Sequence, residues 1–311
     1  MRVMSEDSSR TVGSGQHSPT LRRRRSDELA ASPTLRRRRL ARQLLRLREE
    51  AGMTAKQAAA EAKKRAPKGS WFEAKITRIE TRKILRVRDA DVQTLLDVYG
   101  VTDPDDREAY RRLAREAAQS GWWVGYRDVL GSGTYVDLET EASRIRSYQV
   151  LHLPGLLQTE TYARRVIRAG GVTDEEEVER RVEVRMMRQH ILSRADAPRL
   201  WAVIDESAFR KIPRDIAAEQ IQHLIDVQRT SLRIQVLPDE VGPHSGMDGS
   251  FVILDFPDDP STVYLEQSGS ALFVEDPQQM EHYETVYDLV HASALSVDDS
   301  LAWMRRRIET L

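Results

Sequence analysis

The chain contains no cysteine, and this absence excludes several kinds of site. Without thiols there are no disulfides, no thiolate zinc sites and no cysteine nucleophiles. Long hydrophobic runs are also missing, since no stretch of about 18 apolar residues occurs and the N-terminus lacks the apolar core of a signal peptide. We therefore expect a soluble, cytoplasmic protein that does not bind a membrane.

Residue patterns typical of catalysis are scarce as well. The seven histidines form no i,i+4 pair and no HExxH pattern, and Walker, GxGxxG and GxSxG motifs are absent. Asp205 and Glu206 are adjacent carboxylates that could serve acid/base or metal chemistry, but an acidic cap at a helix start is the simpler interpretation. We predict that the protein is not an enzyme and needs no metal or cofactor.

Charge is distributed unevenly along the 311 residues. The net charge is −1, yet residues 1–121 hold 28 basic and 17 acidic side chains, a net charge of +11. The remaining residues hold 20 basic and 32 acidic side chains, a net charge of −12. A basic half beside an acidic half fits a module that binds a polyanion, joined to one that does not.

Composition suggests three segments: residues 1–34, 35–121 and 122–311. Residues 1–34 are rich in Ser, Gly, Thr and Arg without periodicity, which predicts disorder. The string SPTLRRRR occurs at residues 18–25 and again at 32–39, where it leads into a helix with leucines at helical spacing. The first copy is either a mobile arm that contacts DNA or a passive tail.

Residues 53–99 show the pattern of a helix-turn-helix. Thr54 and Gln57 have the spacing of a capping box, which predicts a helix start there. Ser70 and Glu73 have the same spacing and predict the start of a second helix. Ala58 lies on the first helix and is small enough to let the second one cross closely.

The second helix is the predicted recognition helix, because its other face is polar and basic. Ile76 and Ile79 should face the core, and Glu80 should pair with an arginine. Trp71 and Phe72 stand at the helix start, where aromatic residues more often pack into the core than contact bases. The first helix of the pair should contact phosphates, and the recognition helix should contact base edges in the major groove. The predicted DNA-binding residues are Thr54, Lys56 and Gln57 on the first helix, and Glu73, Ala74, Lys75, Thr77 and Arg78 on the recognition helix.

The second half mixes helices with strands, so the predicted fold class is α+β. An all-α N-terminal domain is followed by a mixed domain with a mainly antiparallel sheet flanked by helices. Residues 135–146 look helical, and the last four strands follow one another closely, which favours a meander. The loop Gly242–Gly249 could bind a ligand or a partner segment, or it could be a wide hairpin turn. The predicted strands are LWAVID, LRIQVL, SFVILDF, TVYLE and ALFVE.

With these segments in place, the chain from about residue 32 onward resembles a known family. It is similar to the actinobacterial XRE-type helix-turn-helix regulators of the WhiJ kind, which are antitoxin-like and carry an uncharacterised C-terminal domain. The resemblance implies a transcriptional regulator with a small partner protein. It is densest in PTLRRRRLARQLLRLREEAGMT, KITRIE, LLDVYG, SYQVLHLPGLLQTETYARRV, RVEVRMMRQHIL, LWAVIDESA, IQVLPDEVGPHSGMDGSFVILDFP and TVYLEQ.

The sequence departs from that family in two places. The segment AKKRAPKGS makes the turn before the recognition helix longer, and its basic side chains are either phosphate contacts or a solvated loop. The segment TRKILR follows Glu80 where the family has a turn that contains glycine.

Two functions fit these features. The first is a sequence-specific transcriptional regulator that binds double-stranded DNA and whose C-terminal domain binds a small partner protein or effector. The alternative is an antitoxin-type protein that neutralises a partner and autoregulates its own operon. A homodimer is compatible with either function.

Overall fold

The computed structural model describes residues 33–84, 86–119, 125–130, 133–267 and 270–311, all within one compact unit, Ser32–Leu311. The predicted domain boundary at Gly121 and residues 1–32 of the segment predicted to be disordered are outside the described residues. Pro33 and Thr34, from the same predicted segment, belong to the first helix. Among the helices of the described segments, none is long and apolar enough to cross a membrane.

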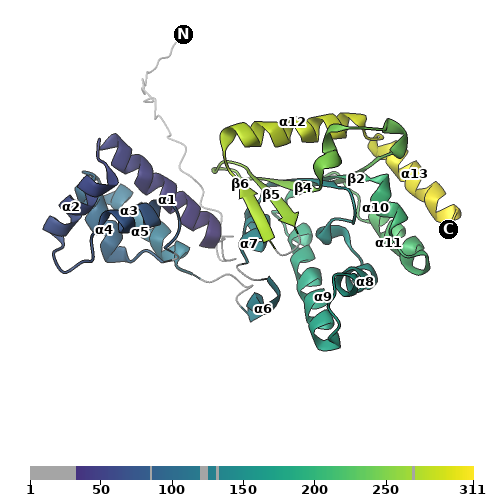
Figure 1. Ribbon diagram of the computed structural model, residues 1–311, viewed down its shortest axis with the longest axis horizontal. Coiled ribbons are helices and arrows are strands. Elements are labelled where there is room, and N and C mark those ends of the chain that lie inside the picture. The colour runs from purple at the N-terminus through teal and green to yellow at the C-terminus, as the bar shows by residue number, and fades with distance from the viewer. Residues whose placement is uncertain (1–32, 85, 120–124, 131–132, 268–269) are drawn as a thin grey trace, which may run out of the picture. The chain divides into compact units, whose positions relative to one another are not determined.

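Helices account for the regular structure of residues 33–119 (Figure 1). Leu44, Ile76 and Leu96 are almost fully buried and join these helices in one core. The fourth helix buries Val92 and Leu96 and ends just before Gly100, whose φ of 76° suits a glycine. The helices are α1 (Pro33–Glu50), α2 (Ala55–Arg65), α3 (Glu73–Glu80), α4 (Asp89–Val98) and α5 (Pro104–Ala117).

One predicted helix start is confirmed and the other is wrong. Thr54 caps α2, and its side chain and that of Gln57 form both bonds of the capping box. Helix α3 begins at Glu73 after Phe72, which makes no capping hydrogen bond with its side chain, so the box predicted at Ser70 does not form. The reason is tertiary, because the preceding Trp71 is drawn into the core at 7% exposure.

The second SPTLRRRR copy lies in the first turns of α1, and its side chains bond within the protein. Leu35 is buried in the same apolar cluster as Leu138. Arg36 pairs with Glu116 at 2.8 Å, and Arg39 pairs with Asp259 at 2.6 Å. The second copy is therefore part of the folded structure, whereas the first lies outside the described residues.

The rest of the described chain contains a six-stranded mixed sheet with helices, which confirms the α+β class. The strands are β1 (Arg144–Gln149), β2 (Arg199–Asp205), β3 (Leu232–Leu237), β4 (Phe251–Asp255), β5 (Thr262–Gln267) and β6 (Ser270–Val274). The helices are α6 (Arg127–Leu130), α7 (Thr134–Glu141), α8 (Glu160–Ala169), α9 (Glu175–Gln189), α10 (Glu206–Arg210), α11 (Arg214–Asp226), α12 (Pro277–Ser293) and α13 (Val297–Glu309).

The strand order is β3-β2-β1-β4-β5-β6, which corrects the predicted meander. Strands β4, β5 and β6 do form an antiparallel meander, but β3 pairs in parallel with β2 at the opposite edge. The reason is that α10 and α11 lie between β2 and β3 and supply the crossover that parallel strands require. Residues 144–146, predicted to be helical, belong to β1, which pairs with both β2 and β4.

Both faces of the sheet are covered, as the alternation of side chains along each strand requires (Figure 1). On one face, Tyr148 and Val203 pack with Tyr287 and other residues of α12. On the opposite face, Ile145 and Leu200 belong to a cluster that reaches α7, α8, α11 and α13. In Figure 1, α12 crosses one side of the sheet, and α8 and α9 lie on the other.

The carboxylate of Asp255, at the end of β4, determines how part of the sheet's stability depends on pH. It accepts hydrogen bonds from Arg144 at 2.7 Å, Arg146 at 2.9 Å and Ser261 at 2.6 Å. Burial alone would raise the pKa of Asp255, but these bonds outweigh burial and lower that pKa below its usual value. The stabilisation is therefore present above the unfolded-state pKa, about 4, and is lost as the pH falls through the folded-state pKa.

We therefore expect Asp255→Asn to lower the free energy of unfolding clearly at about pH 6 and by less at about pH 3, which lies below the unfolded-state pKa. Urea denaturation at the two pH values measures both losses. Asp288→Asn, at an exposed position on α12, is the control and should change little at either pH. An equal loss for Asp255→Asn at both pH values would contradict the linkage.

Candidate nucleic-acid interface and a pocket beside the sheet

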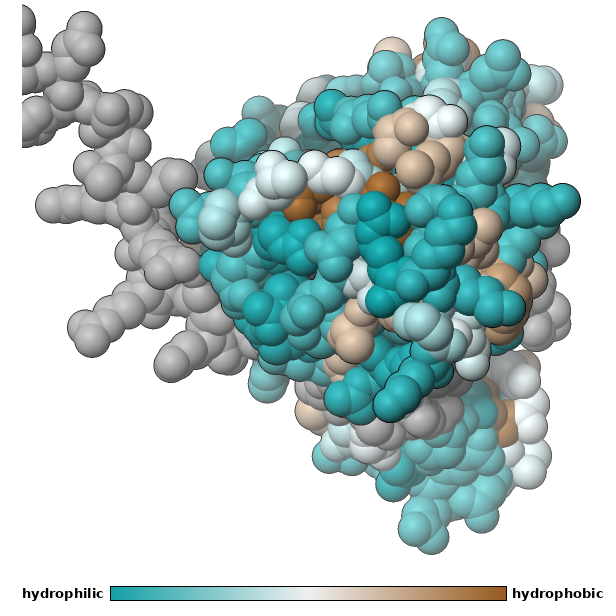
Figure 2. Space-filling view, turned by 90° about the vertical axis from the view of Figure 1, so that its left-hand side faces the viewer, coloured by the Kyte–Doolittle hydropathy of each residue, from teal (hydrophilic) through white to brown (hydrophobic). Residues whose placement is uncertain are grey.

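Helices α2 and α3 form the expected pair, and the outer edge of α3 is open. Ala58 and Ala59 of α2 are buried, which lets the two helices pack closely. Ile76 and Ile79 point into the core, as predicted. Figure 2 shows the face that lies on the left in Figure 1, and its described surface is mostly hydrophilic with small apolar spots. The exposed residues of α3 include Glu73, Ala74, Thr77 and Arg78.

Lys75 is the one predicted base-contacting residue that the structure places elsewhere. Its side chain is 9% exposed, and its ammonium group donates a hydrogen bond of 2.9 Å to Asp91. The same nitrogen lies 4.0 Å from the centre of the Trp71 ring, a cation–π contact. The prediction that Lys75 lies on the exposed face of α3 is therefore wrong, because the helix periodicity leaves it between the two faces and a buried carboxylate decides its direction.

The start of α2 offers groups suited to a phosphate. The Lys56 side chain is exposed, and the first amide groups of the helix carry the positive end of its dipole. The Thr54 hydroxyl and the Gln57 amide already bond to each other, at 3.0 Å. These two residues orient the helix end, so Lys56 is the side chain there that remains available for contact.

The two departures from the family pattern have structural explanations. Helix α2 continues through Lys63 to Arg65, so the connection to α3 is shorter than the sequence suggested. After α3, Arg82 adopts a φ of 64°, the left-handed conformation that glycine usually provides at a helix end. Glu80 pairs with Arg48 at 2.7 Å, as predicted, and holds the end of α3 against α1.

The buried position of Lys75 leads to a prediction about stability. Lys75→Ala should lower the free energy of unfolding by about 1–3 kcal/mol, because Asp91 loses one of its two charged partners in a buried setting. Chemical denaturation measures this loss, with the exposed Lys56→Ala as a control expected to change stability by less than about 0.5 kcal/mol. If Lys75→Ala kept full stability but lost DNA binding, its side chain would instead reach the DNA.

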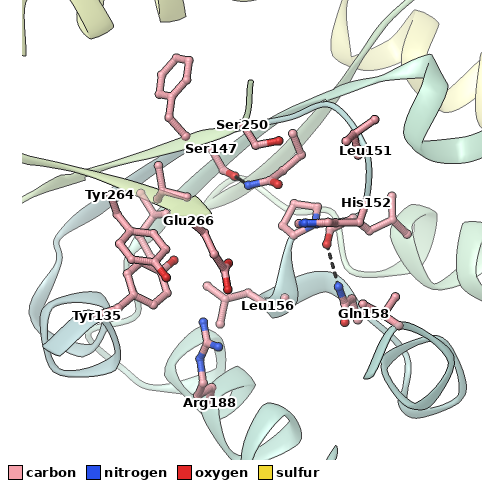
Figure 3. A pocket seen from close by; sticks show the side chains of 18 of the residues that line it. Tyr135, Ser147, Leu151, His152, Leu156, Gln158, Arg188, Ser250, Tyr264 and Glu266 are labelled. Carbon is pink, nitrogen blue, oxygen red and sulfur yellow. Dashed lines mark hydrogen bonds between the residues drawn. The ribbon is translucent and has the colours of Figure 1, made fainter. Parts of the chain in front are cut away.

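A second candidate site is a cavity of about 410 Å³ beside β1 (Figure 3). It is lined by Ile145, Ser147 and Gln149 of β1, together with Leu200 of β2 and Val252 of β4. Because β1 lies between β2 and β4 in the sheet, the cavity lies over three neighbouring strands.

One wall of the cavity is aromatic and one is charged. The rings of Tyr135 and Tyr264 stack with their centres 3.9 Å apart, and burial raises the pKa of Tyr264 to about 12, so both stay neutral phenols at physiological pH. Below them in Figure 3, Arg188 of α9 points into the cavity and pairs with the buried Glu139 at 2.9 Å. Glu266 of β5 lies opposite Arg188 in the same view.

Sequence reasoning missed this cavity and considered the loop Gly242–Gly249 instead. That loop is not a hairpin turn, because β3 and β4 are not neighbours in the sheet. His244, in the loop, lies 3.6 Å from Asp205, which caps α10 as predicted by accepting a hydrogen bond from the Ser207 amide. The signal that could have revealed the cavity is the alternation of Ile145, Ser147 and Gln149, which puts polar residues on a buried face of β1.

Comparisons with known proteins support the division into these two sites. Residues 39–110 match a family model described as a helix-turn-helix domain. Residues 132–306 match a family model described as a domain of unknown function, DUF5753. No curated protein and no solved structure matches the chain. The helix-turn-helix predicted from the sequence is confirmed.

Proposed function

The chain belongs to the DUF5753 family and carries a helix-turn-helix domain, and on that premise we propose that it is a sequence-specific transcriptional regulator whose C-terminal domain responds to a bound effector or small partner protein. Such a regulator acts in the cytoplasm on double-stranded DNA. Membership of the WhiJ-like, antitoxin-like regulators of actinobacteria is part of the same proposal.

The observation that carries the DNA-binding proposal is the exposed edge of α3. Its polar and basic side chains stand on a short helix that is held rigidly by buried isoleucines and by the Arg48–Glu80 pair. Arg78 makes no side-chain hydrogen bond or ion pair among the described residues, so its guanidinium is free to bind a guanine edge. The exposed Lys56 supports a phosphate contact on the same helix pair.

The cavity supports an effector more than a protein partner. Its volume of about 410 Å³ falls within the range of small-molecule sites. The antitoxin-type alternative instead needs an exposed surface that covers a partner. Detection of a tight complex with a co-encoded small protein, formed equally well when the cavity is blocked, would favour that alternative.

Selection of bound sequences from a pool of random DNA duplexes tests the proposed function. We expect one sequence family to be enriched, with an affinity about 10³-fold or more above that for unrelated duplexes at physiological salt. Footprinting on the enriched sequence should show protection confined to it. Equal binding to all duplexes, with affinity that depends only on salt, would overturn sequence-specific regulation.

A further inference from the structure

The cavity beside β1 has polar groups on a sheet face that is otherwise apolar. Ile145, Ser147 and Gln149 share this face, and the neighbouring strands place Leu200 and Val252 on it. The Gln149 side chain donates a 3.1 Å hydrogen bond to Ser147, while its own oxygen has no partner among the described residues. A buried acceptor without a partner is destabilising, so its presence at a cavity indicates that a ligand completes the site.

Arg185 and Glu266 are the charged side chains of the cavity that form no ion pair among the described residues, and the carboxylates of Glu266 and Glu139 act on Arg185 from beyond ion-pair distance. Within the described segments, the one hydrogen bond of the Arg185 side chain runs 2.7 Å to the side-chain oxygen of Gln158. Gln158 is held in that orientation because its amide nitrogen donates to the Leu153 carbonyl, the bond drawn in Figure 3. Burial and the neighbouring Arg188 lower the pKa of Arg185 to about 10, so it is still a cation at neutral pH.

The two arginines on this wall differ in a way that matters for ligand charge. Arg188 is bonded to Glu139 through two nitrogens, at 2.9 and 3.0 Å, so that pair adds little net charge. Arg185 keeps its full positive charge and unused N–H groups in a partly desolvated place. A planar guanidinium in this state matches a carboxylate, which it can bind through two parallel hydrogen bonds.

The remaining walls fit a flat apolar body. The stacked Tyr135 and Tyr264 offer an aromatic surface, and Ile145, Leu156 and Leu200 supply an apolar lining. Aromatic rings prefer offset or edge contact with one another, and such pairs add to the stabilisation from burial alone. A planar ring system of two fused rings is well within the volume of the cavity.

We propose that this cavity binds a small aromatic acid, with its carboxylate on Arg185 and its ring against Tyr135 and Tyr264. The inference rests on the effector-binding role proposed above and gives that effector a chemical class. Glu266 faces the same cavity and forms no ion pair among the described residues, so it disfavours a second negative charge on the ligand. The site therefore selects a monoacid over a diacid or a phosphate.

The test uses three probes that share an indole ring and differ in charge: indole-3-acetate, the neutral indole-3-acetamide, and the cationic tryptamine. Calorimetric titration of the full chain, without DNA, should give the smallest dissociation constant for the acetate, by about tenfold over the acetamide. The acetate should also raise the melting temperature. This comparison uses the unaltered chain, so it does not depend on whether any variant folds.

Arg185→Gln should weaken acetate binding by about tenfold or more and leave acetamide binding unchanged. It should lower the melting temperature little, because Arg185 forms no ion pair among the described residues. Arg168→Gln is the matched control, since Arg168 pairs with Glu175 on the surface and lines no described wall of the cavity. It loses the same charge and should bind the acetate normally.

Any of four outcomes would overturn the inference. One is equal binding of acetate and acetamide, and another is acetate binding that Arg185→Gln does not weaken. The third is preferred binding of tryptamine, which would make Glu266 the charge-selecting group. Failure of all three probes to bind would refute an aromatic effector but leave DNA recognition standing, because duplex selection measures that function separately.

Discussion

Arg78→Ala is expected to lower affinity for the selected DNA sequence by about 5- to 150-fold, the loss that corresponds to one good base contact of about 1–3 kcal/mol. Arg78 is exposed on α3, close to Thr77, and its side chain has no partner among the described residues. The loss should be largest for the selected sequence and small for unrelated duplexes, because a base contact carries sequence information and a phosphate contact does not.

Gel-shift titration at fixed salt measures both affinities, and unchanged denaturation curves show that the fold survives. Arg112→Ala is the matched control, since Arg112 is exposed on α5, which packs against α1 and α4. It removes the same charge and should change affinity little. If Arg78→Ala weakened all duplexes equally, Arg78 would be a phosphate contact and base reading would belong elsewhere on α3.

Local sequence signals predicted the N-terminal helices well, because the residues that start and end them act within a few positions. Thr54 and Gln57 cap α2, and Ile76 and Ile79 of α3 face the core. The start of α3 was wrong for the opposite reason. Trp71 packs into a core formed by distant helices, and no spacing rule contains that contact.

Lys75 shows the same limit at the level of a functional site. Helical periodicity put Lys75 on the same face as Thr77 and Arg78, but Lys75 is also next in sequence to the buried Ile76. Asp91, sixteen residues along the chain, then determines which way it points. A single sequence shows the two charges but not that they meet, so the partner of a residue on the border of a face cannot be predicted.

The sheet illustrates how order along the chain differs from order in space. The strands themselves were predicted from their β-branched and apolar composition, apart from β1, which was assigned in part to a helix. Their order was not, because β3 lies at the edge beyond β2 while β4 returns to β1. The alternation of polar residues along β1 hints at the cavity, but its other lining strands could not be predicted before the topology was known. The homodimer and the partner protein stay predictions.

Arg188→Met is expected to cause the largest loss of stability, about 3–5 kcal/mol, because it leaves Glu139 buried without its cation. The Glu139 side chain is 2% exposed, and it accepts two hydrogen bonds from Arg188, at 2.9 and 3.0 Å. Burial disfavours the charged form of Arg188, but Glu139 outweighs burial and raises the pKa of Arg188 above its usual value. Urea denaturation of the full chain measures the loss.

A double-mutant cycle separates this pair from the ligand-binding charge. Arg188→Met combined with Glu139→Leu should recover most of the stability, since an apolar pair of similar volume often replaces a buried ion pair without loss. Arg181→Met, which breaks a more exposed pair with Glu177 on the same helix, should cost less than about 1 kcal/mol. Because Arg185 keeps its charge in the double variant, that protein should still prefer indole-3-acetate to tryptamine. Loss of that preference would mean that Arg188, and not Arg185, selects the acid.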